Sequence, residues 1–276
     1  MYALSANLFM NMNLFLNDIS FMAFPLNAIL FLLWIVSLFL LWRTASRSGI
    51  VRFLLNNKTV CISISLFIAS CLFIGFSGRR DLSVSWPFIL VLLFFQTVLA
   101  MVIFRGWRRP HASGRPVDSV RWRFLLLHAG LFIAVASAFW GAPDTQTYRV
   151  RLHPDSVNLP SDTPTEAYRM DGSRVWMDCT MSLLDFKFET SDNGVPLTYD
   201  ASVMIDGEQV DLRVNHPYSR KFGEDIYLTG YDDVSGVCIL QVVYEPWKYT
   251  ALIGIIMMLA GAFLLFLRGP QNRSES

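Results

Sequence analysis

Long apolar runs alternate with short polar links along most of the chain. Each of five runs is free of Asp, Glu, Lys and Arg and is about long enough to cross a hydrocarbon core of roughly 30 Å as a helix. The pattern predicts a helical integral membrane protein with about five transmembrane helices, at Leu26–Trp42, Val60–Phe76, Trp86–Phe104, Phe124–Trp140 and Tyr249–Leu267.

The stretch between the fourth and fifth runs has the two-residue period of β-strands instead. Tyr199–Asp206 alternates apolar and polar residues, Asp206–Gly207 is typical of a two-residue hairpin turn, and the alternation resumes at Val210. We expect further strands, and a second turn at Asn193–Gly194, in an inserted all-β domain that forms an antiparallel sheet or sandwich. The further strands are Leu183–Thr190, Ile226–Tyr231 and Val237–Tyr244.

Two more features of this domain follow from composition. Val237–Tyr244 is apolar on both faces, which favours a central place in the sheet. The stretch Pro143–Pro164 is rich in Pro and Asp and shows no period, so we expect it to be loop.

Charge is distributed unevenly between the membrane runs and the inserted domain. Gly141–Trp247 holds 18 acidic and 8 basic residues, whereas the rest of the chain holds 4 acidic and 15 basic ones. An acidic water-soluble domain of this kind argues against binding of nucleic acid. The basic residues gather in the links after the first and third runs and after the fifth, and such an excess marks the cytoplasmic side.

This charge bias predicts the topology. Residues 1–23 form an extracytoplasmic segment, and residues 24–140 contain four transmembrane helices with basic cytoplasmic loops. The β-rich domain, 141–247, is extracytoplasmic, the last transmembrane helix spans 248–268, and 269–276 form a cytoplasmic tail. Trp140 and Trp247 are expected at the outer interface of the bilayer, where indole rings prefer to lie.

Several kinds of chemistry are not encoded. The four cysteines form no Cys-x-x-Cys pair and no Cys-x-x-Cys-His, so neither a thioredoxin-like redox site nor a c-type haem site is predicted. Cys179 and Cys238 either pair, if their strands are neighbours, or remain free and buried. No phosphate-binding loop, hydrolase motif or zinc motif is present.

His128 is the main candidate for a functional site, because an ionisable residue inside a membrane helix is costly and is a functional candidate by default. It lies about 6 Å inside the expected cytoplasmic end of the fourth run. A neutral imidazole there can ligate a metal, relay a proton or form a hydrogen bond to a neighbouring helix. Ala129 and Gly130 leave room for a bulky group or for the close approach of another helix.

His216 is a weaker candidate, in the motif Val214-Asn-His-Pro217. Asn and Pro favour a turn between two strands, so the residue is either a turn histidine bonded to its own backbone or a ligand. His111 and His153 are expected to be solvated.

Three stretches together resemble the ResB (CcsB) family of system II cytochrome c biogenesis, over about residues 60–267. The first is Ser85-Trp-Pro-Phe88, which opens a membrane helix. The second is Leu127-His-Ala-Gly130, which leads to Trp140-Gly-Ala-Pro143. The third is the series of motifs Met181-Ser-Leu-Leu-Asp-Phe186, Val214-Asn-His-Pro217 and Glu245-Pro246, followed by a helix with Gly254 and Gly261.

The resemblance implies a multi-pass protein of the bacterial inner membrane, with its large domain on the periplasmic side. Such proteins work with a CcsA/ResC-type membrane partner to move haem outward and attach it to exported apocytochrome c. The family's intramembrane haem ligand maps onto His128. The sequence departs from the family in its extra N-terminal helix, in Glu245-Pro246 where Asp-Pro is usual, and in its small exported domain.

Two hypotheses follow. In the first, the chain is a subunit of a cytochrome c haem lyase or synthase complex that handles haem transiently and has no self-contained active site. In the second, it is a non-catalytic membrane-anchored scaffold or sensor whose β domain binds a protein.

Overall fold

The computed structural model describes residues 20–78, 82, 85–107, 119–154, 156, 163–190, 196–232 and 235–268. The expected tail at 269–276, the turn at Asn193–Gly194 and most of the 1–23 segment lie outside these residues. The chain forms two compact units. Asp144–Pro246 make up one, and the segments on either side of it make up the other.

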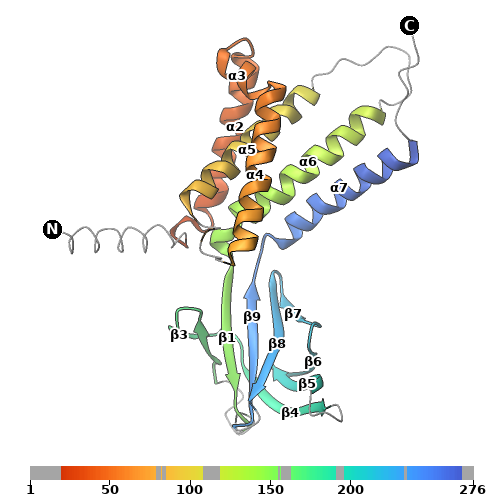
Figure 1. The fold of residues 1–276 in the computed structure, drawn as a ribbon. Coiled ribbons are helices and arrows are strands. Elements are labelled where there is room, and N and C mark those ends of the chain that lie inside the picture. Colours follow the sequence, from red (N-terminus) through yellow and green to blue (C-terminus); the bar gives the residue numbers. More distant parts are fainter. Residues whose placement is uncertain are drawn as a thin grey trace, which may run out of the picture. The chain divides into compact units, whose positions relative to one another are not determined.

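The first unit contains five helices long and apolar enough to cross a membrane, as the sequence predicts. Figure 1 shows them as the coiled ribbons at both ends of the chain. Two short 3-10 helices, Ser20–Met22 and Ala142–Asp144, accompany them. The membrane helices are α2 (Leu26–Thr44), α4 (Asn57–Ser77), α5 (Trp86–Trp107), α6 (Ser119–Trp140) and α7 (Lys248–Arg268).

Helix α5 is the most buried of the five, because α2, α4 and α6 all pack against it. Met101 of α5 is fully buried and Val98 nearly so, in a cluster with Leu38 and Trp42 of α2. The outward faces of the helices carry large apolar side chains, as expected for contact with lipid.

The link between α2 and α4 contains a short helix that the sequence pattern does not indicate, α3 (Gly49–Leu54). It begins where the Ser48 side chain accepts a hydrogen bond from the backbone N–H of Val51 at 3.2 Å. It ends at Leu54, and the carbonyl oxygen of the next residue, Leu55, accepts a hydrogen bond from Nη1 of Arg105 at 3.1 Å. An arginine of α5 therefore stabilises the C-terminal end of α3.

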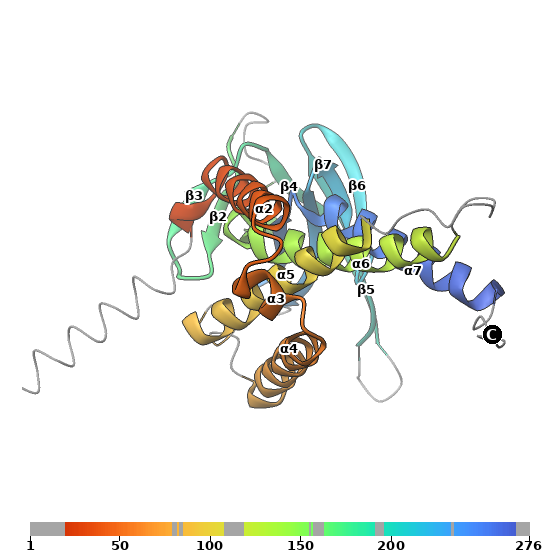
Figure 2. The same ribbon diagram turned by 90° about the horizontal axis from the view of Figure 1, so that it is seen from above.

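Helices α6 and α7 pack along each other, and both Figure 1 and Figure 2 show them side by side. Small residues make this approach possible. A Cβ on Gly130 would lie 2.6 Å from the Gly254 carbonyl oxygen, and a Cβ on Gly254 would lie 2.6 Å from the Ala134 nitrogen. Close contact of backbones through glycine is a common means of joining helices in lipid. The space beside Gly130 is therefore filled by another helix, one of the two possibilities that the sequence leaves open.

The second unit is an all-β domain with nine strands among the described residues, paired antiparallel in two sheets. Together with the five helices, it confirms the predicted fold class. The larger sheet has the order β3-β2-β1-β9-β8-β7, and the smaller one the order β4-β5-β6. The strands are β1 (Gln146–Leu152), β2 (Glu166–Arg169), β3 (Arg174–Trp176), β4 (Met181–Thr190), β5 (Pro196–Ile205), β6 (Glu208–Arg213), β7 (Tyr218–Lys221), β8 (Glu224–Asp232) and β9 (Val237–Tyr244).

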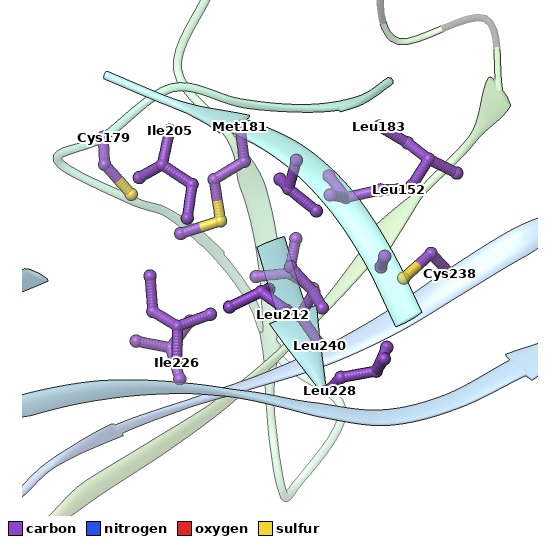
Figure 3. Close-up of a cluster of buried hydrophobic side chains, with 14 of the residues drawn as sticks. Leu152, Cys179, Met181, Leu183, Ile205, Leu212, Ile226, Leu228, Cys238 and Leu240 are labelled. Carbon is purple, nitrogen blue, oxygen red and sulfur yellow. The ribbon is translucent and has the colours of Figure 1, made fainter. Parts of the chain in front are cut away.

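Side chains from both sheets form one apolar core, so the domain is a sandwich. Val150, Ile226 and Leu240 of the larger sheet and Val203 and Leu212 of the smaller sheet are fully buried. Figure 3 shows the labelled members of this core converging from the two sheets. Along each strand they alternate with side chains of the opposite face, because successive side chains of a strand point to opposite faces; in β9 that face is buried or half-buried too.

The domain confirms some expected details and corrects one. Strand β9 pairs with β1 and β8, so it is internal to the larger sheet, as its two apolar faces indicate. Asp206 and Gly207 both have positive φ, at 49° and 84°, as a two-residue hairpin turn requires. The expectation that Pro143–Pro164 is loop is wrong for residues 146–152, which form β1. Pairing with β9 along its whole length stabilises β1 despite its two exposed arginines.

A cluster of charged residues, which we call the Arg220 cluster, ties the two sheets together. Arg220 of β7 pairs with Asp178 at 2.5 Å, with Asp206 of the β5–β6 turn at 2.9 Å and with Glu224 of β8 at 2.5 Å. Burial opposes the charged form of Arg220, but the hydrogen bonds to Glu224 and Asp206 outweigh it, so its pKa is raised. Lys221 binds Asp178 at 2.5 Å, and this bond lowers the pKa of Asp178.

Candidate functional site

His128 lies on α6, within Trp122–Trp140, which is long and apolar enough to cross a membrane. Its side chain is half-buried. The residue is thus within the membrane segment and still open on one side.

A backbone hydrogen bond determines the tautomer of the neutral His128 ring. Nδ1 lies 2.8 Å from the carbonyl oxygen of Phe124, one turn earlier on the same helix. A carbonyl oxygen only accepts hydrogen bonds, so Nδ1 carries the proton. In the neutral ring Nε2 then has a lone pair, and no partner for it is found among the described residues. An imidazole of this tautomer can ligate a metal through Nε2.

The Phe124 ring also packs against His128. Their ring centroids are 4.0 Å apart and the planes are inclined by 27°. On α5, Gly106 lies against this same ring, because a Cβ on Gly106 would be 2.1 Å from Cε1 of Phe124. The imidazole therefore belongs to a three-residue stack that joins α5 and α6.

His216 is exposed and lies in the β domain, so the structure does not bring it together with His128 within one unit. Its backbone N–H donates to the Arg213 carbonyl oxygen at 3.1 Å, closing a turn in which Asn215 has a φ of 64°. This is the backbone-bonded turn that its neighbours favour. His153 is exposed too, and His111 lies outside the described residues.

A polar network within the membrane helices was missed by the sequence analysis. Gln96 of α5 is fully buried and accepts a hydrogen bond from Nε1 of Trp140 at 3.3 Å. Asn27 of α2, 1% exposed, donates to the Trp140 carbonyl oxygen at 2.7 Å. The Trp140 indole is thus buried among α2, α5 and α6, at the C-terminal end of α6. The sequence signal that could have indicated this network is the presence of Gln96 and Asn27 inside apolar runs.

The β domain contributes one aromatic cavity of about 260 Å³. Tyr148, Trp176 and Tyr244 line it, and Lys221 and Glu224 of the Arg220 cluster complete its polar wall. Trp176 is 60% exposed, so a large apolar surface is open to solvent here. The cavity is suited to hold an apolar or aromatic side chain.

The cysteines of the domain take no part in a visible site. Cys179 and Cys238 are free and buried, so of the two open alternatives the structure shows the unpaired one. Burial raises the pKa of both thiols to about 12, which keeps them protonated and unreactive. Within the described part of the chain, no three His, Cys, Asp or Glu residues gather as a metal site would require.

Fold and site together define a multi-pass helical membrane protein that carries a β-sandwich domain and presents one imidazole nitrogen within its helices. No family model and no curated protein matches the sequence. Among solved structures, "Cytochrome c Heme Lyase CcmF" matches with a TM-score of 0.41 and 10% identity, over 76% of this chain. This chain covers 34% of that protein's length, and a match at this level carries no argument about its chemistry.

Proposed function

We propose that this chain is a haem-handling subunit of a membrane complex that attaches haem to exported apocytochrome c. A CcsA/ResC-type membrane protein is its partner in this proposal. One observation carries it: His128 has Nδ1 bonded to the Phe124 carbonyl oxygen, so Nε2 is a bare nitrogen ligand inside the membrane span. The sequence resemblance described above supports the same assignment.

The residues present fit one side of a haem. His128 would hold the iron through Nε2, and the bonded Nδ1 would keep the ring in the required tautomer. The other three histidines of the chain are outside the membrane runs, so a second histidine for the iron would come from the partner subunit. Bound haem would supply the vinyl groups that are joined to the apocytochrome cysteines. This chain's part is to bind and orient it.

Replacing His128 with Ala tests the proposal. Haem should disappear from the absorption spectrum of the purified complex, and cytochrome c maturation should stop. The chain should still insert, because Ala costs less in lipid than His. Added imidazole should restore part of the haem signal, since it supplies the same nitrogen ligand in the space left by the ring.

His216→Ala is the matched control, because it removes an exposed histidine from a turn and should change neither readout. If His128 only stabilises the helices, its loss costs about 0.6 kcal/mol, the average for a hydrogen bond in membrane helices. Haem content and maturation would then be normal, and the ligand assignment would be wrong.

The proposal also places the β domain outside the cytoplasm, as the basic links favour. Two exposed serines can be replaced to test this, Ser173 in the β domain and Ser46 in the α2–α3 link. A membrane-impermeant thiol reagent should label Ser173→Cys in intact spheroplasts and Ser46→Cys only after lysis. Cys179 and Cys238 add little background, because both are buried with raised pKa values. The reverse labelling would invert the topology.

The aromatic cavity favours a second candidate, a membrane-anchored scaffold whose β domain binds a protein segment. Trp176→Ala would remove the exposed wall of that cavity. If the chain is a scaffold, Trp176→Ala should abolish binding of the protein partner, and His128→Ala should not change that binding. For the haem-handling subunit, His128→Ala has the dominant effect.

A further inference from the structure

Gly106 is in the last turn of α5 and is buried, and the Phe124 ring of α6 fills the place that its side chain would take. A Cβ at Gly106 would lie 2.1 Å from Cε1, 2.8 Å from Cδ1 and 3.0 Å from Cζ of that ring. Contacts below 3.0 Å force a neighbour to move. Any larger residue at this position would therefore displace the Phe124 ring.

Phe124 also restrains the His128 imidazole in two ways. Its carbonyl oxygen accepts the Nδ1 proton at 2.8 Å, which selects the tautomer. Its ring stacks on the imidazole with centroids 4.0 Å apart, which limits rotation of the imidazole about its Cβ–Cγ bond. One residue thus determines both which nitrogen is bare and where it points.

We propose that Gly106 and Phe124 are positioning residues that hold His128 with Nε2 as an oriented, unprotonated ligand. Gly106 acts through the ring, since its missing side chain allows Phe124 to occupy the one place from which it stacks on the imidazole. The site takes a ligand that accepts a lone pair, such as a metal centre. This inference rests on the proposed function for the identity of that centre, haem iron, but the orientation of the ring can be measured without haem.

Three variants separate positioning from simple helix packing. Gly106→Ala inserts a methyl group against the ring, Phe124→Leu removes the ring without a clash, and the double variant removes both the clash and the ring. Gly75→Ala is the matched control, because Gly75 is a helix glycine of α4 with nothing within 4 Å of its Cβ position. If the contact between Gly106 and Phe124 serves packing alone, Phe124→Leu and the double variant should change neither the His128 tautomer nor the affinity for haem.

The first measurement is nitrogen NMR of the haem-free full chain, labelled at histidine and solubilised in detergent, with the His128 signal identified by its loss in His128→Ala. Wild type and Gly75→Ala should show one neutral tautomer, protonated at Nδ1. Gly106→Ala, Phe124→Leu and the double variant all lose the stacked ring that holds the imidazole against the backbone carbonyl oxygen, so they should show exchange between both tautomers. An unchanged single tautomer in Phe124→Leu would overturn the inference, even if Gly106→Ala fails to insert.

The second measurement is haem affinity of the complex, titrated with haemin. Loss of a group that orients a metal-bound histidine typically weakens binding about 10-fold or more. We expect that loss in Gly106→Ala, in Phe124→Leu and in the double variant. If wild type binds no haemin while its NMR behaves as described, the proposed function fails and the positioning role stands. If haemin binds equally to all variants, the positioning role fails and the proposed function stands.

Discussion

The membrane helices and the β domain differ in the residues that they expose and in the use that they make of buried polar groups. In the sandwich, Val203 and Leu212 are fully buried and charged side chains cover the surface. Among the helices, Phe76 and Phe266 are 88% and 85% exposed, whereas Gln96 and Asn27 are almost completely buried. Lipid tails are as apolar as these side chains, so apolar burial does not drive helix association.

The difference shows where function is to be sought in each unit. A buried leucine in the sandwich needs no explanation beyond the hydrophobic effect. A polar group among membrane helices costs free energy that packing does not offset. Its presence therefore indicates a specific role. His128 is such a group, and it is held by a bond from Nδ1 to the Phe124 carbonyl oxygen and by the Phe124 ring.

The largest expected effect is on the sandwich core. Leu212→Ala removes a fully buried side chain between the two sheets. It should lower the free energy of unfolding of the β domain by about 4 kcal/mol, within the usual range for buried leucine. Pulse proteolysis of the full-length protein in urea measures this. The matched change in α7, Leu259→Ala, affects a side chain that is 64% exposed and should have little effect on stability. Equal losses of stability in Leu212→Ala and Leu259→Ala would contradict the difference between the two units.

The Arg220 cluster is the next most sensitive feature. Arg220→Ala leaves Glu224, whose side chain is only 5% exposed, with Lys221 as its remaining cation. Breaking a buried ion pair costs about 3 kcal/mol or more. Arg174→Ala is the control, because its pair with Glu166 at 2.7 Å is exposed and is worth at most about 1 kcal/mol. The same proteolysis assay compares them, and similar losses would show that burial of the cluster is unimportant.

The glycine contact between α6 and α7 should be less costly to disturb. Gly254→Ala places a methyl group 2.6 Å from the Ala134 nitrogen, so the helices must separate. Overpacking of this kind costs about 2 kcal/mol. Thermal unfolding in detergent should show a lower midpoint for Gly254→Ala than for Gly75→Ala, which meets no neighbour within 4 Å. Equal midpoints would mean that the close approach contributes nothing.

At neutral pH the smallest effect is that of the two buried thiols, which depends on pH. Burial raises the pKa of Cys179 and Cys238 from 9.0 to about 12, so the folded domain keeps both protons where the unfolded chain loses them. Stability is therefore complete below pH 9 and falls as pH rises from 9 toward 12. The slope is about 1.4 kcal/mol per pH unit for each thiol. Replacing both cysteines with Ala should flatten the decline between pH 9 and 10. If the stability of the variant falls as steeply as that of wild type, other titrating groups cause the decline.

The sequence alone determines much of the architecture. Hydropathy over a window of about 18 residues marks each membrane helix, and alternation over six to eight residues marks most long strands. Both signals are local, so they identify α5 or β9 without knowledge of any neighbour. The exception is β1, where Tyr148, Val150 and Leu152 alternate with arginines. The Pro and Asp residues of the surrounding stretch led us to expect a loop there. Pairing with β9, which the local sequence does not reveal, makes this stretch a strand.

The candidate site divides in the same way. His128 can be singled out from sequence, because an ionisable residue within an apolar run is rare. The bond to Phe124 is local too, one helical turn away. What only the tertiary structure decided is how the ring is held. Gly106 is 18 residues before Phe124 on another helix, and no periodic pattern links a glycine on one helix to a ring on the next. Such contacts arise when two helices approach within van der Waals distance, which depends on the packing of the whole bundle.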